Sequence, residues 1–341
     1  MRPNLSAEPR AAVLAGLGGY VPPTVVTNEM LAQRLNTTDE WISSRTGIRE
    51  RHVAAPGQAT SDLAVEAGTR ALKSAAGNGT PPEADLVVVA TTTPDHPLPG
   101  TAPAVAARLG LGNAAAFDIA AVCSGFVYAL ATASAAITAG LARQALVIGA
   151  ETFSTILDPN DRTTVPIFGD GAGAVLLRAG RPDEAGALGR FDLGSDGDLA
   201  ELIIVPAGGS RQRSTGQPAP VEDTYFAMQG RAVFVHAVNR MAQSARTVLD
   251  ATGWTGPEVD WLVGHQANAR ILRAVADQLE VPTDRAVMNL DRVGNTSAAS
   301  IPLAMADAAE RFTPGDRLLL TAFGGGLTWG SATLTWPNLE I

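Results

Sequence analysis

Several features that would assign this chain to a particular class are scarce or missing. There is one cysteine in 341 residues, so no internal disulfide can form, which fits a reducing cytoplasm. The net charge is −9 and no run of Lys or Arg interrupts it, which argues against nucleic-acid binding through phosphate neutralisation. No apolar run approaches the ~18 residues of a membrane span. We therefore expect a cytoplasmic protein that binds neither nucleic acid nor membrane.

The sequence also lacks the patterns of a metal site and of a secretion signal. Four His and one Cys without clustered spacing do not predict metal ligands. Residues 11–21 have the length of a secretory hydrophobic segment, but Glu8 and Pro9 precede them and no A-x-A cleavage site follows. We expect a buried strand at 11–18 and a flexible tail at 1–10.

The apolar residues that are present occur in short runs, which predict buried strands. Helical stretches such as 61–75 lie between the runs, and this alternation is typical of an α/β protein with helices on both faces of its sheets. The runs expected to form strands are 11–18, 85–93, 114–121, 144–152, 172–179, 260–266, 285–290 and 317–323.

The spacing of these runs indicates an internal duplication. Asp85 opens a strand, Cys123 follows 38 residues later, and another strand begins 22 residues after that. In the second half of the chain Asp260 opens a strand, Asn295 follows 35 residues later, and Leu318 lies in the next strand 23 residues after that. Two such halves packed together would bring the turns at Cys123 and Asn295 to one central site. This plan predicts an N-terminal half at 11–180, a surface insertion rich in Gly, Asp, Pro and Ser at 181–225, and a C-terminal half at 226–341.

Cys123 lies in DIAAVCSGF (118–126), between an expected strand and a helix of small residues. A cysteine at a helix N-terminus faces unpaired backbone N–H groups and the positive end of the helix dipole, which lowers the thiol pKa and favours a nucleophilic thiolate. A buried, inert cysteine is the common alternative, and position alone leaves both interpretations open.

Three downstream segments offer groups that could work with a thiol. His265 ends an expected strand in GHQANARI (264–271), where α/β enzymes place reactive groups, although it could also be satisfied by its neighbours. Asn295 in GNTSAASIP (294–302) could be ordinary turn chemistry, but its place in the duplicated plan favours a functional role. The glycines of FGGGLTWGS (323–331) could form a flexible turn or bring backbone N–H groups to a reacting oxygen.

Taken together, these segments resemble β-ketoacyl-[acyl-carrier-protein] synthase III, a condensing enzyme of the thiolase fold. The similar segments run in family order from about residue 11 to 335 and include DEWISSRTGIRERH (39–52), DIAAVCSGF, DPNDRTT (158–164), IFGDGAGAVLL (167–177), GHQANARI, GNTSAASIP and FGGGLTWGS. The resemblance implies duplicated α-β-α-β-α layers and a homodimer. It also implies an acyltransferase that condenses an acyl-CoA starter with malonyl-acyl carrier protein to initiate fatty acid or polyketide chains, without a cofactor.

The resemblance implies roles for single residues of this chain. Cys123 would hold the acyl group as a thioester, and the backbone N–H groups of Cys123 and Gly325 would form the oxyanion hole. His265 and Asn295 would donate hydrogen bonds to the enolate that forms when a malonyl thioester loses CO₂. Phe168 would pack beside the thiol. Leu98 would reach into the acyl pocket of the partner subunit, where a leucine would admit starters longer than acetyl.

Substrate contacts are implied in the same way. Trp41 and Arg162 would sandwich the adenine of coenzyme A. The whole expected coenzyme A set is Trp41, Arg45, Arg162, Gly230, Arg231, Phe234, Ala267 and Asn268, and the carrier protein would dock on Arg270 and Arg273. Arg231 replaces a frequent Asn of the family, which puts one pantetheine contact in doubt. Several lysines common near Arg270 are absent, so docking would be weaker or shifted towards Arg231 and Arg273.

Two other functions remain open on the sequence alone. One is an acyl-CoA-dependent acyltransferase of the same family that acts on a secondary-metabolite acceptor, although Asn295 counts against it because transfer alone forms no enolate. The other is a catalytically silent binding module on the same fold, which the presence of Cys123, His265 and Asn295 disfavours. The starter acyl group, the acceptor and the pathway are not determined by the sequence.

Overall fold

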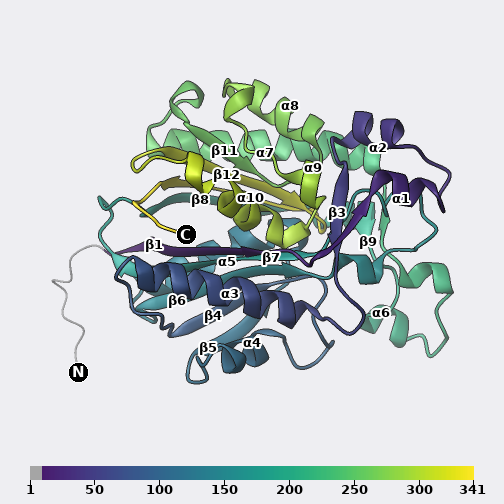
Figure 1. The fold of residues 1–341 in the computed structure, drawn as a ribbon, viewed down its shortest axis with the longest axis horizontal. Helices are drawn as coiled ribbons and strands as arrows, with labels where there is room; N and C mark the ends of the chain where they lie inside the picture. Colours follow the sequence, from purple (N-terminus) through teal and green to yellow (C-terminus); the bar gives the residue numbers. More distant parts are fainter. Residues whose placement is uncertain (1–9) are drawn as a thin grey trace.

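The computed structural model describes residues 10–341, so residues 1–9 of the expected tail lie outside the described residues. The described chain forms two mixed β-sheets with helices between them and on both outer faces (Figure 1). Between residues 10 and 341, no helix is long and apolar enough to cross a membrane.

The first sheet has five strands in the order β1-β7-β6-β4-β5. Its strands are β1 (Ala11–Tyr20), β4 (Leu86–Ala90), β5 (Ala115–Ile119), β6 (Gln144–Glu151) and β7 (Gly171–Gly180). β4 runs parallel to β5 and β6, whereas β7 runs antiparallel to β6 and β1. All five residues of β4 are buried aliphatic side chains, as expected for a strand that is covered on both faces. Each of these five strands was expected from an apolar run.

The second sheet has the order β11-β12-β13-β8 and departs from the sequence-based expectation in three places. Its strands are β8 (Leu188–Ser195), β11 (Trp261–Gly264), β12 (Arg317–Gly324) and β13 (Thr328–Thr335). β8 lies inside the segment expected to be a surface insertion, and it pairs with β13 as an edge strand. β13 was not expected at all. The strand expected at 285–290 is wrong, because only Ala286 forms a bridge, to Leu262.

The helices form three layers around the two sheets. The central layer holds α5 (Gly125–Thr138) and α10 (Ser300–Ala308), which contact both sheets. The outer layers are α3 (Thr60–Gly77) with α4 (Ala102–Arg108), and α7 (Gly230–Thr252) with α8 (Ala269–Leu279). Ala129, Ala133 and Ala304 of the central helices are fully buried, and such small side chains allow the sheets to approach from both sides. The result is the expected α-β-α-β-α order (Figure 1).

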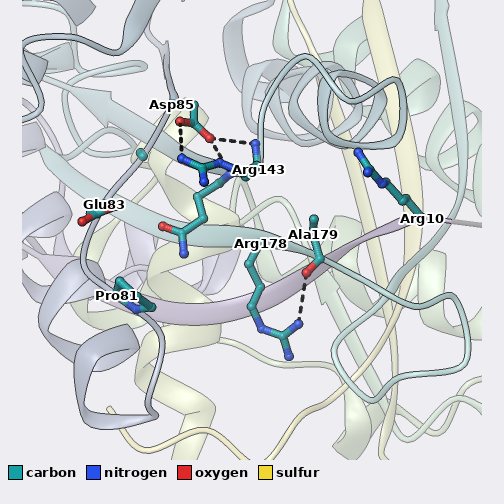
Figure 2. A pocket seen from close by; sticks show the side chains of 9 residues that line it. Arg10, Pro81, Glu83, Asp85, Arg143, Arg178 and Ala179 are labelled. Carbon is teal, nitrogen blue, oxygen red and sulfur yellow. Dashed lines mark hydrogen bonds and ion pairs between the residues drawn. The ribbon is translucent and has the colours of Figure 1, made fainter. Parts of the chain in front are cut away.

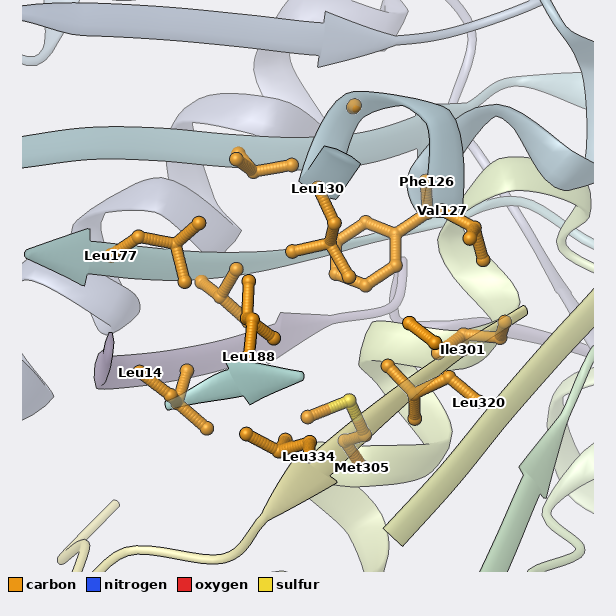
Figure 3. Packing of buried hydrophobic residues seen from close by; sticks show 14 of the residues in the cluster. Leu14, Phe126, Val127, Leu130, Leu177, Leu188, Ile301, Met305, Leu320 and Leu334 are labelled. Carbon is orange, nitrogen blue, oxygen red and sulfur yellow. The ribbon is translucent and has the colours of Figure 1, made fainter. Parts of the chain in front are cut away.

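The space between the sheets is filled by one continuous hydrophobic core (Figure 3). Both sheets and both central helices contribute to it. The labelled side chains are Leu14, Phe126, Val127, Leu130, Leu177, Leu188, Ile301, Met305, Leu320 and Leu334. Because the two halves share this core, they form one packed unit.

Shorter elements gather near one end of the sheets, to the right in Figure 1. They include α1 (Asn28–Ala32), α2 (Asp39–Thr46), the paired strands β2 (Thr24–Thr27) and β3 (Glu50–Val53), α6 (Ser210–Arg213), the paired strands β9 (Ile203–Ile204) and β10 (Ala227–Met228), and α9 (Leu290–Val293). Their clustering places segments distant in sequence around the start of the central helices.

The turns that precede the two central helices have the same backbone shape. Val122 begins the 3₁₀ turn η1 (Val122–Ser124) with φ 47°, and Ser297 begins η7 (Ser297–Ala299) with φ 48°. Positive φ is rare for residues other than glycine, so its recurrence marks the two turns as equivalent. The structural counterpart of Cys123 is therefore Ala298. Asn295 lies three residues before Ala298, so it is not the direct counterpart of Cys123.

Candidate active site

Cys123, His265 and Asn295 line one narrow cavity of about 50 Å³. Cys123 comes from η1 before α5, His265 follows directly after β11, and Asn295 lies between α9 and η7. All three are nearly buried, with exposed fractions of 9%, 3% and 4%. The structure thus brings together the three residues to which the resemblance assigns the chemistry.

The backbone around Cys123 is closely packed by the glycine-rich segment after β12. A Cβ atom at Gly324 would lie 2.7 Å from the Cys123 backbone nitrogen, and one at Gly325 would lie 3.3 Å from Val122. Only glycine permits this approach. The segment therefore lies where backbone N–H groups next to Cys123 can face a reacting oxygen.

The Cys123 thiol has a raised pKa of about 12, not the lowered one expected at a helix N-terminus. Burial is the largest cause, because a thiolate is poorly solvated there, and the nearby Glu151 adds to the effect. A hydrogen bond from Ser297 and the local backbone favour the thiolate but do not outweigh burial. At neutral pH Cys123 is therefore a neutral thiol.

His265 is held as a neutral hydrogen-bond donor. Burial lowers its pKa from 6.5 to about 3, so the ring carries no charge at neutral pH. Its Nδ1 lies 2.7 Å from Ser300 Oγ, which accepts a hydrogen bond from the Gln266 backbone N–H at 3.4 Å. Ser300 can donate its proton to Nδ1, and in that tautomer the ring proton lies on Nε2.

Asn295 has its side-chain orientation fixed by the turn that follows it. The Ser297 backbone N–H donates to Asn295 Oδ1 at 2.9 Å. With the carbonyl oxygen engaged, the Nδ2 amide is the group left to donate into the cavity. The Asn295 backbone also pairs with the chain around Phe168, donating to Ile167 O at 2.8 Å and accepting from Gly169 N–H at 3.0 Å.

An aromatic cluster forms another wall of the cavity. Phe168 stacks on Phe153, with ring centroids 4.2 Å apart, and Phe226 packs edge-on against both rings. Phe168 was expected beside the thiol, but Phe153, Phe226 and Ile203 also line the cavity and were not expected. For Phe153 a signal existed, because it lies two residues beyond β6, at the same sheet edge as the end of β5.

A wider cleft of about 540 Å³ lies beside the narrow cavity. The two spaces share walls, because residues adjacent in sequence line different ones: Ile167 and Asn268 line the cleft, whereas Phe168 and Ala267 line the narrow cavity. Of the expected coenzyme A contacts, the cleft is lined by Trp41, Arg45, Gly230, Arg231, Phe234 and Asn268, together with the expected docking residue Arg270. A substrate lying in the cleft would therefore reach the thiol through the narrow cavity.

The cleft is positively charged although the whole chain is acidic. Among the described residues that line it, Arg45, Arg231 and Arg270 carry charge and no Asp or Glu does. Arg45 and Arg162 lie over the Trp41 ring, 4.6 Å and 4.9 Å from its centroid. Such a surface suits a ligand that combines phosphates with a flat base.

Four expected site residues line neither space: Leu98, Arg162, Arg273 and Gly325. Leu98 is 86% exposed, and Arg273 is exposed on α8 without lining the cleft. This exposure leaves the Leu98 side chain free to contact a partner subunit.

The pocket in Figure 2 is not a second active-site candidate. It has a volume of about 450 Å³ and is lined by Arg10, Glu83, Asp85, Arg143 and Arg178, among others. It lies where β4 and β6 begin, whereas ligands of parallel sheets bind where strands end. Arg143 is also 3.6 Å from Asp85, so part of its charge is already paired.

Comparison with known proteins agrees with this geometry. Residues 117–197 match the family described as 3-oxoacyl-[acyl-carrier-protein (ACP)] synthase III, and residues 249–336 match its C-terminal part. The β-ketoacyl-[acyl-carrier-protein] synthase III 5 of Streptomyces coelicolor is 63% identical over 331 residues, covering 96% of this chain and 98% of that protein. The chain belongs to the β-ketoacyl-[acyl-carrier-protein] synthase III family.

Other members of this synthase III family give the same result. The synthase III of Pseudomonas aeruginosa is 53% identical over 333 residues, covering 97% of this chain and 98% of that protein. A crystal structure of the Pseudomonas aeruginosa FabH matches with a TM-score of 0.89 and 51% identity, covering 97% of this chain and all of the other. A priming β-ketosynthase of a polyketide pathway also matches with a TM-score of 0.89, at 32% identity, covering 99% of this chain and all of the other. The expected thiolase-like fold is confirmed, and the chain is an acyltransferase of the synthase III type.

Proposed function

We propose that this chain condenses an acyl-CoA starter with malonyl-acyl carrier protein through an acyl thioester on Cys123. The observation that carries the proposal is the meeting of a thiol, a neutral imidazole and an oriented amide in one buried cavity. The product is a β-ketoacyl chain on the carrier protein, which initiates fatty acid or polyketide synthesis.

In the first half-reaction, Cys123 attacks the acyl-CoA and coenzyme A leaves. The backbone N–H groups of Cys123 and Gly325 receive the negative charge that develops on the thioester oxygen. The close packing of Gly324 against the Cys123 backbone supports this role, because it brings both peptide segments to one point.

In the second half-reaction, the malonyl thioester loses CO₂ and becomes an enolate. This step needs no base; it needs donors to the enolate oxygen, which His265 Nε2–H and the Asn295 amide supply. Both donors are uncharged and fixed by Ser300 and Ser297, so they cost no reorganisation when the charge forms.

The arginine-lined cleft holds coenzyme A in this proposal. Arg162 lies over Trp41 in the structure and moves aside for the adenine to stack between the two side chains. Arg270 and Arg273 attract the acidic carrier protein. The active form is a homodimer in which Leu98 enters the partner's acyl pocket.

The proposal is tested by measuring the two half-reactions separately. Cys123→Ala removes the only thiol of the chain, so intact-mass analysis after incubation with acyl-CoA is expected to find no acyl-enzyme. An acyl mass that persists in this variant contradicts the nucleophile assignment.

Asn295→Asp tests the division of labour between the half-reactions. A carboxylate there repels the enolate, so malonyl decarboxylation is expected to fall by about 100-fold or more while Cys123 acylation falls much less. Asn113→Asp, in the exposed turn before β5, makes the same substitution outside the site and leaves both rates unchanged. If Asn295→Asp leaves decarboxylative condensation intact, Asn295 is not a donor to the enolate; if the wild type acylates Cys123 but condenses no malonyl thioester, the chain is a simple acyl transferase.

A further inference from the structure

Two hydroxyl groups that the mechanism above does not use meet beside Cys123. Ser124 follows the cysteine in η1 and is fully buried, and Thr328 is the first residue of β13. Their side-chain oxygens lie 2.6 Å apart, although 204 residues separate them in the chain. The two side chains therefore join the helix start that carries Cys123 to the glycine-rich segment after β12.

The Thr328 hydroxyl lies within hydrogen-bond distance of a carbonyl on each side of this junction. Its Oγ1 is 3.0 Å from the Gly325 carbonyl oxygen and 3.1 Å from the Ala121 carbonyl oxygen. Ser124 Oγ is 2.8 Å from the same Ala121 oxygen, so the contacts bracket Cys123. Two hydroxyl protons cannot serve all four contacts at once. When Ser124 donates to Thr328, the Thr328 proton is left for the Gly325 carbonyl, which links the two segments.

The turn that begins the glycine-rich segment needs such a contact because its backbone is flexible. Thr328 is paired with the last residue of β12, so residues 325–327 form the turn, and two of the three are glycines. Glycine adopts positive and negative φ with similar ease. Asp196 and Leu327 exchange two backbone hydrogen bonds at 2.8 Å and 2.9 Å, which fix the outer end of the turn. The Thr328 hydroxyl fixes its inner end, at Gly325.

The two N–H groups expected to bind the substrate oxygen lie on the two segments that the hydroxyls join. Within residues 10–341, neither the Cys123 N–H nor the Gly325 N–H donates to a backbone carbonyl. Both residues are buried, and a buried N–H without an acceptor costs free energy. Two such donors stabilise a developing oxyanion only when their spacing lets both reach the same oxygen. The contacts that set this spacing are therefore part of the catalytic geometry.

We propose that the Ser124 and Thr328 hydroxyls position the oxyanion hole. They hold the Cys123 and Gly325 N–H groups at the spacing that lets both bind one thioester oxygen. This inference rests on the proposed acyl transfer to Cys123. Neither hydroxyl touches the substrate, so both belong to positioning residues.

The chemical step that they support is the attack on the acyl-CoA. The Cys123 sulfur forms a bond to the acyl carbon, and the electron pair of the C=O bond moves to the oxygen, where the two N–H groups receive it. The pair returns as the bond from the acyl carbon to the coenzyme A sulfur breaks. The Cys123 proton passes to solvent, and the departing coenzyme A thiolate takes up a proton from solvent.

Two reactions of the same thiol separate this role from a general effect on the site. Acylation by a thioester places charge on a carbonyl oxygen and so needs the oxyanion hole. Alkylation by iodoacetamide forms a bond from sulfur to a saturated carbon as iodide leaves, so no oxygen gains charge. Cys123 is the only cysteine of the chain, and intact mass of the full-length protein therefore follows both reactions at one atom. Loss of a positioning residue slows acylation alone.

Thr328→Val keeps the shape of the side chain and removes the hydroxyl. A panel of straight and branched acyl-CoA donors from acetyl to octanoyl first identifies the fastest donor for the wild type, and single-turnover acylation is then measured with that donor. The limiting rate is expected to fall about 10- to 100-fold, since a displacement of about 1 Å can cost 100-fold. The donor concentration that gives half of this rate is unchanged, because the hole acts on the transition state. Thr328→Ser keeps the hydroxyl and restores most of the rate.

Thr333→Val is the matched control in the same strand. The Thr333 hydroxyl also has two contacts, with the Arg190 N–H at 3.2 Å and with Thr252 Oγ1 at 3.1 Å, but it lines neither space of the site. This variant is expected to keep both rates. Ser124→Ala removes the other hydroxyl and is expected to slow acylation about threefold or more without slowing alkylation. It decides the proposal if Thr328→Val does not fold.

Acylation of Thr328→Val at the wild-type rate overturns the proposal, as does a parallel fall in its alkylation or an equal fall in Thr333→Val. Acylation of Ser124→Ala at the wild-type rate overturns it too, and so does a Thr328→Ser variant as slow as Thr328→Val. A change confined to the donor concentration at half rate would assign the hydroxyl to substrate binding instead. A wild type that gains acyl mass from no donor overturns the proposed function together with this inference, whereas an acylated wild type beside an equally fast Thr328→Val overturns this inference alone.

Discussion

His265 makes the protein less stable in acid by an amount that follows from its burial. The pKa of this histidine is lowered from 6.5 to about 3 in the folded chain. Because the folded pKa lies below the unfolded one, the full stability is present above pH 6.5 and is lost as the pH falls towards 3. In that range the unfolded chain binds a proton that the folded chain refuses.

The size of the loss can be worked out for two convenient conditions. Linkage between a pKa of 6.5 in the unfolded chain and 3 in the folded chain gives about 2 kcal/mol between pH 7.5 and pH 5.0. A folded pKa one unit higher changes this figure by only ~0.1 kcal/mol, since pH 5.0 still lies above it. The prediction therefore depends on the burial of His265 rather than on the exact pKa.

The measurement is the free energy of unfolding in urea at both pH values, at one protein concentration. Other buried groups also titrate: the pKa values of Glu151 and Asp170 are raised, and these carboxyls favour the folded state as the pH falls. The informative quantity is thus the difference between wild type and His265→Asn. The variant is expected to lose about 2 kcal/mol less than wild type between the two conditions.

His96→Asn is the control, because His96 is exposed in a loop. Its loss between the two pH values is expected to match that of wild type within about 0.5 kcal/mol. If His265→Asn loses as much stability as wild type does, His265 is not a neutral group in the folded protein. The assignment of its Nε2–H as an uncharged donor to the enolate would then have no basis.

Three further predictions concern the cleft, the packing around the site and the choice of starter. Trp41→Ala is expected to raise the KM for acyl-CoA roughly tenfold with little change in kcat, since stacking on a base contributes ~1–3 kcal/mol. The control Trp254→Ala removes a tryptophan that pairs with Arg317 outside the cleft, and it is expected to leave the KM unchanged. Gly149→Ala places a Cβ 2.2 Å from the Ala298 carbonyl oxygen and is expected to lower the free energy of unfolding in urea by about 1–3 kcal/mol. The control Gly77→Ala adds a Cβ that has no atom within 4 Å, so it is not expected to destabilise the protein. Leu98→Phe is expected to lower the ratio of kcat/KM for isobutyryl-CoA to that for acetyl-CoA, since each methylene changes discrimination by about 1 kcal/mol or more; an unchanged ratio shows that Leu98 does not line the pocket.

The strands that the sequence predicts well are those with a continuous aliphatic run. β4 and β6 are buried on both faces, so nearly every position had to be apolar. β13 is also mostly buried, but its sequence TWGSATLT contains no continuous aliphatic run. A Cβ at Gly330 would lie 3.0 Å from Val127 of α5, so a larger side chain does not fit at that position. β8 is an edge strand with only one buried residue, and its Gly, Arg and Asp residues resemble a loop.

The site was predictable where chemistry lies at the end of a strand. Cys123 and Asn295 could be inferred because the duplication related their turns, and His265 because it follows the end of a buried strand. Glu151 had a comparable signal, as an acidic residue that ends a buried strand. The raised thiol pKa could not be read from the sequence, because the helix N-terminus was visible and the burial was not. Ile203 was equally hidden, since it lies in the segment expected to be an insertion.

The duplication explains how one fold supplies both a nucleophile and its supporting donors. Asp85 and Asp260 hold equivalent strand starts by accepting backbone N–H bonds from Arg143 and Arg317 at 2.7 Å and 2.8 Å. Counted from these two residues, Cys123 is equivalent to Ala298, and Gly125 is equivalent to Ser300.

The equivalent positions have diverged in a complementary way. At the start of α5, a Cβ on Gly125 would lie 3.1 Å from Ala90, so a side chain fits poorly there. The reactive group of this turn is the Cys123 thiol, two residues earlier. At the start of α10, Ser300 is free to hold His265, while a residue without a reactive group, Ala298, occupies the place of the thiol. Ser297, equivalent to Val122, donates its hydroxyl hydrogen bond to Glu151 at the end of β6. One copy of the turn thus carries the sulfur, and the other carries the hydroxyls that orient its partners.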